Sequence, residues 1–461
     1  MLGEVLQWQY PADAVLSHWF RAHSNAGLRD RGEIAEAVFD VLRHLRRYRQ
    51  FAESGQGAAT RRLAILGLAS VWPRSTLDPG LDEHEKPWLD HVQGFALDAL
   101  PPGVRHSVPE WLETRLAALP DADALLRALN QPAPLDLRVN PFKTDRDAVL
   151  RAWSQGPEAK WAAQPTPYSP WGLRIQGRPP VNRWRSFERG EIEVQDEGSQ
   201  LLAALVAPKR GEMVIDYCAG AGGKTLLLGA LMRSTGRLYA FDVSAARLAR
   251  AKPRFARSGL SNIVPVVIAE RHDQRVKRLR GKAHRVLVDA PCSGLGTLRR
   301  NPDLKWRQHP DTLAQLLLAQ AAILRDAAAC VRPGGRLVYA SCSLLPEENE
   351  QQVQAFLADN PDFILLDAGA VLADRGIALP LSGPMLRLRP DVHGTDGFFA
   401  AVMQRAKPAA GGADADAAVD TKADTGGDAD AAVDAAADTD RALSADGAAA
   451  APGALDQSAA E

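Results

Sequence analysis

Two cysteines in the second half of the chain follow short apolar segments that are typical of buried strands. Cys292 comes three residues after Asp289, where the first of these segments ends, and Cys342 comes just after the second. If the two strands are neighbours in one sheet, their ends lie about 5 Å apart, so both thiols could face one cleft. The thiolate form of such a cysteine is a nucleophile. A lone cysteine is more often a small buried hydrophobe, and Cys330, in an Ala-rich helix, fits that description, as does Cys218.

A glycine-rich segment connects a predicted strand to a predicted helix, and it is a candidate for ligand binding. It consists of Cys218, Ala219, Gly220, Ala221, Gly222, Gly223 and Lys224. Glycine lets a backbone approach a ligand closely, and ligands of such sheets bind beyond the carboxyl ends of the strands. A P-loop would need glycine at position 218, and a dinucleotide fingerprint would need glycine or alanine at position 225. The spacing therefore favours neither an ATPase nor an NAD enzyme, and a turn that binds no ligand is the alternative.

An acidic residue, Asp242, ends the next predicted strand. A carboxylate at this place can accept hydrogen bonds from the two ribose hydroxyls of a nucleoside. It could equally cap the helix that follows. The adjacent glycine-rich segment favours the ribose interpretation.

A basic loop follows Cys292 and contains one aromatic residue. The candidate RNA-binding residues in it are Arg299, Arg300, Lys305, Trp306 and Arg307. Cations can contact phosphates while the aromatic ring stacks on a base; ordinary packing is an equally good explanation for Trp306. The zinc deaminase pattern Pro-Cys-x-x-Cys is excluded, because position 295 is leucine.

These residues need elements to position them, and the chain divides into four parts. Residues 1–128 have helical periodicity, and residues 131–195 predict a small α+β module. Residues 196–405 alternate strands and helices, which indicates a Rossmann-like α/β domain with a parallel, doubly wound sheet. Residues 406–461 consist largely of Ala and Asp with few large apolar side chains, so we expect a disordered tail.

Composition limits the class of protein. No apolar run approaches the length of a membrane span, no signal peptide is visible, and four cysteines in 461 residues do not make a disulfide framework. We therefore expect a cytoplasmic monomer without a metal site. Residues 1–405 carry 52 Lys and Arg against 44 Asp and Glu, a net charge of +8 that suits a polyanionic partner such as RNA.

With these motifs identified, the chain from about residue 131 to 405 resembles the RsmB/Sun (Nop-type) family of RNA cytosine-5 methyltransferases. The resemblance rests on Asp289–Gly294, Arg299–Trp306, Cys342–Glu350 and Asp396–Ala400, with lead-in segments at Arg138–Asn140 and Val194–Gln200. It implies a class I methyltransferase fold, S-adenosylmethionine as the cofactor and RNA, foremost ribosomal RNA, as the substrate. The N-terminal helices are faintly similar to a NusB-like RNA-binding domain, and Arg138 would contact RNA from the small module.

The resemblance also implies roles for the candidate residues. Cys342 would attack C6 of cytosine, and C5 would then take the methyl group, while Cys292 would assist release. Asp289 would hydrogen-bond the N3/N4 edge of the base. The segment from Cys218 to Lys224 would hold the methionine end of the cofactor and Asp242 its ribose. Glu270 would lie beside the adenine, with Asp273 as the alternative.

Three departures from the family pattern leave other functions open. Gly220-Ala221 stands where the family usually has Ala-Pro, Ser341 precedes the nucleophile in place of Thr, and Glu270 replaces the usual Asp. The altered glycine-rich segment motivates a non-catalytic RNA-binding assembly factor as one alternative. Methylation of another RNA class such as tRNA, of another RNA atom or of a protein is a further alternative, although an amine acceptor would need no thiol.

Overall fold

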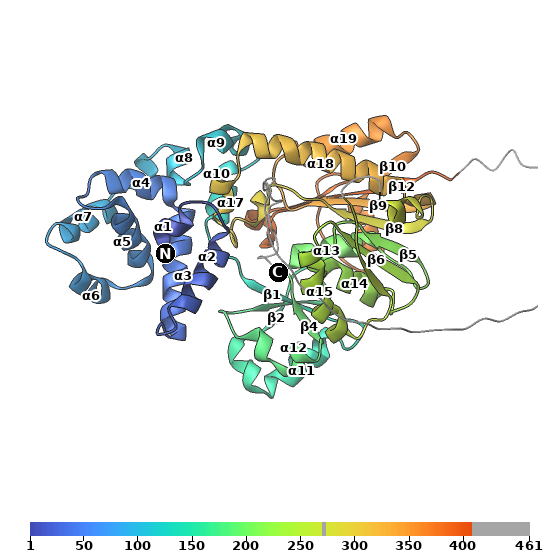
Figure 1. Cartoon of the computed structure of the whole chain (residues 1–461), viewed down its shortest axis with the longest axis horizontal. Helices are drawn as coiled ribbons and strands as arrows, with labels where there is room; N and C mark the ends of the chain where they lie inside the picture. Colours follow the sequence, from blue (N-terminus) through green and yellow to red (C-terminus); the bar gives the residue numbers. More distant parts are fainter. Residues whose placement is uncertain (270–272, 408–461) are drawn as a thin grey trace, which may run out of the picture. The chain divides into compact units, whose positions relative to one another are not determined.

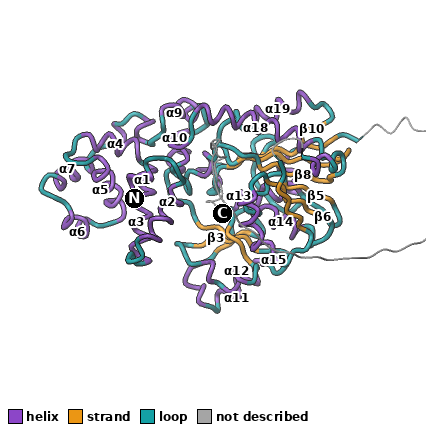
Figure 2. The backbone as a smooth tube through the Cα atoms, in the orientation of Figure 1, coloured by secondary structure: helices purple, strands orange, loops and turns teal. Residues whose placement is uncertain are grey.

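The computed structural model describes residues 1–269 and 273–407 (Figure 1). Up to residue 129 these residues form helices and connecting turns (Figure 2). The helices are α1 (Leu2–Val5), α2 (Ala12–Ala22), α3 (Leu28–Arg43), α4 (Leu45–Glu53), α5 (Ala59–Val71), α6 (Arg74–Leu77), α7 (Glu85–Gln93), α8 (Pro102–Arg105), α9 (Glu110–Ala117) and α10 (Ala122–Leu129). Their apolar faces pack together, as the helical periodicity of the sequence predicts.

A four-stranded antiparallel sheet follows, with strand order β2-β3-β1-β4. Its strands are β1 (Leu135–Val139), β2 (Gln164–Pro165), β3 (Gly172–Ile175) and β4 (Ile192–Val194), and its helices are α11 (Arg146–Ser154) and α12 (Arg185–Glu188). Leu137 and Val139 of β1 pack against Trp153 of α11 in its core. This small sheet has the mixed α+β character that its sequence predicts.

The largest sheet has eight strands. Seven of them follow the order β10-β12-β9-β8-β5-β6-β7, and the eighth, β11, pairs with β12. Its strands are β5 (Met213–Asp216), β6 (Arg237–Asp242), β7 (Ile263–Val267), β8 (Ala283–Asp289), β9 (Val331–Ser341), β10 (Phe363–Leu366), β11 (Leu386–Leu388) and β12 (Phe398–Arg405). Its helices are α13 (Glu197–Val206), α14 (Gly223–Leu231), α15 (Ala245–Ser258), α16 (Gln274–Lys277), α17 (Leu304–Arg307), α18 (Pro310–Ala328), α19 (Glu350–Asp359), α20 (Ala368–Ala373) and α21 (Pro390–His393).

Helices cover both faces of this sheet. Alternate residues of a strand point to opposite faces, so Val214 packs with α13, α14 and α20, whereas its neighbour Ile215 packs with α16, α18 and α19. A strand buried on both faces reads as a continuous apolar run, which is the pattern in the sequence. The Rossmann-like α/β class is confirmed.

The parallel, doubly wound sheet that the sequence predicts has antiparallel strands at one edge. β7, β6, β5, β8 and β9 are parallel, but β12 runs antiparallel to β9, and both β10 and β11 run antiparallel to β12. A parallel neighbour needs a long crossover, whereas β11 turns back into β12 after the single short helix α21. The predicted disorder of residues 406–461 lies outside the described residues, apart from Ala406 and Lys407.

In the described ranges, no helix is both long enough and apolar enough to cross a membrane.

Candidate active site

The carboxyl ends of four adjacent parallel strands gather the predicted catalytic and cofactor residues at one edge of the sheet. β5 ends at Asp216, β6 at Asp242 and β8 at Asp289, while β9 ends one residue before Cys342. Asp289 pairs in register with Ala340 of β9. Residues far apart in the sequence therefore meet because parallel strands end at the same edge.

The two thiols are in contact. Cys292 Sγ lies 3.3 Å from Cys342 Sγ, and the backbone N–H of Cys342 donates to Cys292 Sγ over 3.3 Å. Cys292 is buried, whereas Cys342 is partly exposed. The hydrogen bond to Cys342 and burial together raise the pKa of Cys292 well above its ordinary value. Cys292 therefore keeps its proton and can donate it to the more accessible sulfur of Cys342.

A buried lysine holds the carboxylate next to the thiols. Lys224, in the first turn of α14, places Nζ 2.7 Å from Asp289 Oδ2. Its Nζ also lies 6.0 Å from the ring centroid of Phe398. The ion pair fixes the direction of Asp289 at the end of β8, and it connects the glycine-rich segment with the strand that leads to Cys292.

The glycine-rich segment makes a tight turn whose backbone only glycine adopts easily. Gly220 has φ +57° and Gly222 has φ +85°. A Cβ on Gly222 would lie 2.4 Å from Phe255, so this glycine is needed for packing against α15. A Cβ on Gly220 would meet nothing within 4 Å, so the turn borders open space at that residue.

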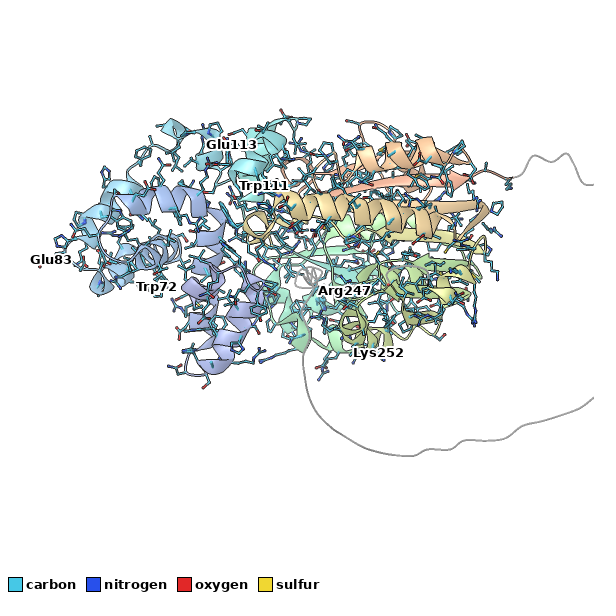
Figure 3. All side chains as sticks on the ribbon, turned by 45° about the horizontal axis from the view of Figure 1, so that its top comes forward. Trp72, Glu83, Trp111, Glu113, Arg247 and Lys252 are labelled. Carbon is cyan, nitrogen blue, oxygen red and sulfur yellow. The ribbon has the colours of Figure 1, made fainter. Side chains whose placement is uncertain are left out.

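Asp242 is hydrogen-bonded to the same turn. Its Oδ2 accepts from the backbone N–H of Gly220 at 2.9 Å, and its Oδ1 accepts from the N–H of Ser244 at 2.7 Å. Arg247, which Figure 3 labels on α15, lies 2.9 Å from Oδ1. Helix α15 is capped by Ser244, whose side chain accepts from Arg247 N. The alternative that Asp242 is itself the cap of this helix is therefore wrong, although Asp242 does bind the backbone at the helix start.

Asp216, at the end of β5, lies at the same sheet edge, although no role was predicted for it from the sequence. It is buried, Thr225 Oγ1 donates to its Oδ2 at 2.7 Å, and its Oδ1 has no hydrogen-bond partner. Burial, with the neighbouring Asp289, raises the pKa of Asp216 to about 7. The available signal was its place as the last residue of a strand directly before the glycine-rich segment.

These residues fit S-adenosylmethionine, which carries an ammonium group and two ribose hydroxyls. The unpartnered Oδ1 of Asp216 is an acceptor of the kind that an ammonium group needs. Asp242 Oδ1 is occupied by Ser244 and Arg247, but Oδ2 accepts one hydrogen bond, from Gly220, and has a second lone pair for a hydroxyl donor. The open space at Gly220 leaves room beside the turn. The methionine end would be held between Cys218 and Lys224, as the sequence predicts.

Glu270 and Asp273 are the two candidates for the residue that follows the third strand. Glu270 lies outside the described residues. Asp273 caps α16, accepts from the backbone N–H of Ala269 at 2.9 Å and pairs with Arg275 at 2.5 Å. The Arg275 guanidinium is the main cause that lowers the pKa of Asp273. Its carboxylate oxygens are thus occupied by a local turn. This favours Glu270 as the residue beside the adenine.

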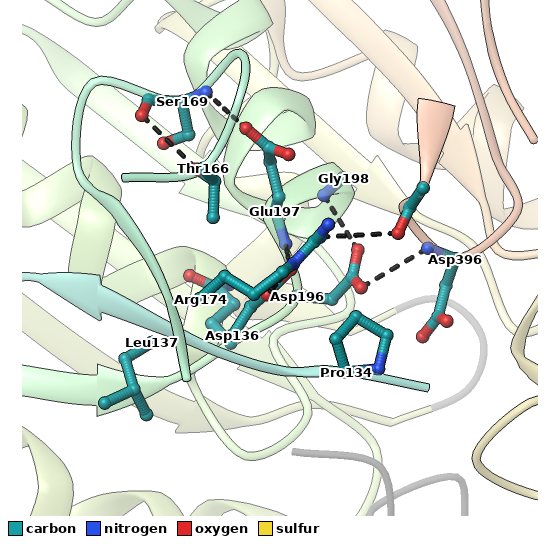
Figure 4. Close-up of polar contacts among 12 residues, drawn as sticks. Pro134, Asp136, Leu137, Thr166, Ser169, Arg174, Asp196, Glu197, Gly198 and Asp396 are labelled. Atoms are coloured by element: carbon teal, nitrogen blue, oxygen red, sulfur yellow. Dashed lines mark hydrogen bonds and ion pairs between the residues drawn. The ribbon is translucent and has the colours of Figure 1, made fainter. Parts of the chain in front are cut away.

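Two arginines of the predicted RNA-binding loop pair with aspartates; Arg299 is buried, and Arg300 is partly exposed. Arg299 pairs with Asp396 at 3.0 Å, and Arg300 pairs with Asp396 at 2.5 Å and with Asp196 at 2.8 Å. Figure 4 shows Asp196 accepting from the backbone N–H of Asp396 at 3.3 Å, near Asp136, which Arg174 binds at 2.7 Å and 2.9 Å. Because these carboxylates pair with the charges of both arginines, we infer that Arg299 and Arg300 hold the loop in place and do not contact phosphates.

The other predicted RNA contacts also have protein partners. Lys305 Nζ donates to the carbonyl of Arg43 at 2.7 Å, and Trp306 Nε1 donates to the carbonyl of Leu42 at 2.7 Å. Burial lowers the pKa of Lys305 well below its ordinary value. Arg307 pairs with Asp303 at 3.4 Å. The packing interpretation of Trp306 is therefore the one that the structure favours, since α17 binds the end of α3.

Arg138 is also buried. It donates to the carbonyl of Gly223 at 2.6 Å and to the side chain of Gln195. It therefore supports the first turn of α14, next to Lys224, from β1 of the small sheet. The resemblance predicted Arg138 as an RNA contact, but its burial and these hydrogen bonds place it inside the protein.

Comparisons with known proteins agree with this geometry. The model of the 16S rRNA methyltransferase RsmB/F family matches residues 203–404, and the model of an RsmF/B-like ferredoxin-like domain matches residues 108–182. The second match begins before β1, so it also includes α9 and α10.

Individual relatives extend the match. The chain is 36% identical over 308 residues to the probable ribosomal RNA small subunit methyltransferase B of Synechocystis sp., covering 66% of this chain and 68% of that protein. It is 38% identical over 308 residues to ribosomal RNA small subunit methyltransferase B of Sodalis glossinidius, covering 66% and 67%. The crystal structure of a methyltransferase homologue from Pyrococcus horikoshii superposes with a TM-score of 0.56 at 29% identity, covering 68% of this chain and 100% of that one.

The matches to the family model and to these relatives span the sheet edge that carries the two thiols and the glycine-rich turn, and the chain belongs to the RsmB/F family of S-adenosylmethionine-dependent RNA methyltransferases.

Proposed function

We propose that this protein methylates C5 of a cytosine in small-subunit ribosomal RNA and that Cys342 forms a transient covalent bond to C6 of that cytosine. The observation that carries the proposal is the contact between Cys292 and Cys342, 3.3 Å apart between sulfurs, beside the Lys224–Asp289 pair. A transfer to nitrogen or oxygen would need no nucleophile that attacks the ring, so two thiols at this edge favour a carbon acceptor.

The reaction at the base would proceed by addition, methyl transfer and elimination. The sulfur of Cys342, as the thiolate, adds to C6, and the π electron pair of the C5–C6 bond moves to C5, which becomes nucleophilic, while Asp289 hydrogen-bonds the N3/N4 edge. When bound, S-adenosylmethionine supplies the methyl group. A base then removes the proton from C5, the C5–C6 double bond re-forms, and the sulfur leaves C6 as a thiolate. Cys292, which keeps its proton, would assist this release.

Two observations support ribosomal RNA as the substrate class. The relative from Sodalis glossinidius is named ribosomal RNA small subunit methyltransferase B, and the one from Synechocystis sp. is named probable ribosomal RNA small subunit methyltransferase B. Residues 1–405 carry a net charge of +8, which favours a polyanion. Transfer RNA is the alternative substrate of the same chemistry, and the assay below separates the two.

The test uses small-subunit RNA from cells that lack the gene, incubated with purified protein and cofactor and analysed by nucleoside mass spectrometry and bisulfite mapping. We expect one 5-methylcytosine, lost completely in Cys342→Ala. Cys292→Ala should accumulate a protein–RNA complex that survives denaturing electrophoresis, because attack remains and release is impaired. Cys330→Ala, which removes a buried thiol remote from the sheet edge, is the matched control and should keep activity.

Full cytosine methylation by Cys342→Ala would refute the proposed nucleophile. Methylation of transfer RNA with no methylation of small-subunit RNA would show that the substrate is transfer RNA and not ribosomal RNA. A wild-type protein that binds RNA but shows no cofactor binding by calorimetry would instead indicate an assembly factor on the same fold.

A further inference from the structure

A buried carboxylate joins the two loops that carry the thiols. Glu348 has no exposed surface, and it accepts hydrogen bonds from four neutral donors. Its Oε1 accepts from the backbone N–H of Ser293 at 2.8 Å and from Nε2 of Gln320 at 2.9 Å. Its Oε2 accepts from the hydroxyl of Ser293 at 2.5 Å and from the hydroxyl of Ser343. Each serine directly follows one of the two cysteines.

The first thiol loop is held on both sides of Cys292. Glu348 binds Ser293, the residue after the cysteine, through both its N–H and its hydroxyl. Gln320 of α18 uses its second amide proton to bind the carbonyl of Pro291, the residue before the cysteine, at 2.9 Å. The position of Cys292 is thus set by one carboxylate and one amide that lie outside its own loop.

The second thiol loop is held in the same way around Cys342. The hydroxyl of Ser341, the residue before the cysteine, donates to Asn349 Oδ1 at 2.5 Å. Asn349 Nδ2 donates to the carbonyl of Ser343 at 3.0 Å, and the Ser343 hydroxyl binds Glu348.

The carboxylate itself is anchored from the core of the sheet. Tyr339 of β9 donates its hydroxyl to the backbone carbonyl of Glu348 at 2.7 Å. A buried carboxylate is costly unless its oxygens are hydrogen-bonded, and this one has four donors drawn from three segments of the chain. Such a group fixes the relative position of the segments that it joins.

We infer that Glu348 is a positioning residue that sets the distance between the sulfurs of Cys292 and Cys342. The inference rests on the proposed function for the roles of the two thiols, but the spacing itself is a property of the protein alone. Without the carboxylate, the two serines lose their common acceptor, and the loops stay linked by the weaker contact between the serine hydroxyls at 3.2 Å and by the backbone bond from Gly296 N–H to the carbonyl of Cys342 at 2.8 Å, which lies beyond the cysteines. A displacement of about 1 Å between reacting groups can cost about 100-fold in rate.

The variants remove different numbers of the hydrogen bonds to Glu348. Glu348→Ala removes the acceptor for all four donors, and Ser343→Ala removes only the connection on the Cys342 side. Glu348→Gln keeps the shape, since its amide oxygen can still accept from the Ser293 N–H and its NH2 group can donate to both serine hydroxyls. Glu347→Gln is the matched control, because Glu347 is the neighbouring, partly exposed carboxylate that pairs with Arg115 at 3.2 Å.

The first measurement reads the thiol spacing without RNA. Phenylarsine oxide forms two As–S bonds with a pair of close thiols and releases one water, a mass change that intact mass spectrometry detects. Wild type, Glu347→Gln and Glu348→Gln should take up one bridging arsenic, absent in Cys292→Ala. Glu348→Ala should bind it at least about 10-fold more weakly, with Ser343→Ala in between. A wild type that binds no bridging arsenic, or equal binding by wild type and both disruptive variants, would overturn the inference.

The second measurement follows methylation of RNA. In Glu348→Ala, kcat should fall about 100-fold while the KM for RNA and the Kd for S-adenosylmethionine stay unchanged, and Glu348→Gln should restore kcat to within about 10-fold of wild type. If Glu348→Ala does not fold, Ser343→Ala decides, with an expected loss of about 10-fold in kcat. A loss of cofactor affinity equal to the loss of kcat would show a general structural role and overturn the inference. If the wild type does not methylate cytosine, the proposed function fails while the arsenical result still tests the spacing.

Discussion

Replacing Asp216 with asparagine should change how the stability of the protein depends on pH. The carboxyl group is buried at the end of β5, and burial raises its pKa from 3.8 to about 7. Between these two values the folded protein holds a proton that the unfolded chain has lost. Raising the pH through this window therefore favours the unfolded state, and the stability that the protonated group contributes is lost as the pH passes the folded pKa.

The size of the effect follows from the two pKa values. A tenfold change in proton affinity corresponds to about 1.4 kcal/mol, so a rise in pKa from 3.8 to about 7 makes the ionised folded state about 4 kcal/mol less stable relative to the protonated one. Asparagine cannot ionise, and its amide oxygen can still accept the hydrogen bond from Thr225. The variant should therefore lose this part of the pH dependence.

The assay is urea unfolding of wild type and Asp216→Asn at several pH values from about 4 to about 8, with the difference in unfolding free energy plotted against pH. Other titrating groups cancel in this difference, which should shift by about 4 kcal/mol in favour of the variant as the pH rises. Asp359→Asn, at the exposed end of α19, controls for the loss of one negative charge. A difference between wild type and Asp216→Asn that stays constant across this range would refute the assigned pKa and the argument from burial.

Two further substitutions test the glycine-rich turn and the arginine that pairs with Asp196 and Asp396. Gly220 and Gly281 have φ +57° and +65° with open space for a Cβ, so alanine at either position should cost about 1–2 kcal/mol, but only Gly220→Ala should weaken binding of S-adenosylmethionine in calorimetry. Equal cofactor affinity of the two variants would contradict the assignment of the turn. Arg300→Ala should cost about 3–5 kcal/mol in urea unfolding, because its two carboxylate partners stay buried, whereas Arg387→Ala, from an exposed pair, should cost at most about 1 kcal/mol. Weaker RNA binding by Arg300→Ala with unchanged stability would restore its role as a phosphate contact.

The strands, the helices and the sheet edge that carries the site could be predicted from the sequence. Apolar runs that end at Asp216, Asp242 and Asp289 are strands because residues buried on both faces of a sheet are apolar without interruption. The carboxyl ends of parallel strands meet, so the closeness of Cys292 and Cys342 followed from their place at two strand ends. These inferences needed only local periodicity and one rule of sheet topology.

The partners of the charged groups could not be predicted from the sequence and are known from the three-dimensional fold. Arg300 in a basic loop has the same sequence pattern whether it meets a phosphate or a buried carboxylate, and its partners Asp196 and Asp396 lie about 100 residues away in either direction. The antiparallel β12 was likewise hidden, because strand direction depends on the connection and not on the apolar pattern of the strand. The same holds for Glu348. In the sequence it is one residue of the motif Cys342–Glu350, and in the fold it accepts hydrogen bonds from both thiol loops. Hydrogen bonds and burial between distant segments arise from tertiary packing, so they cannot be predicted from the spacing of residues along the chain.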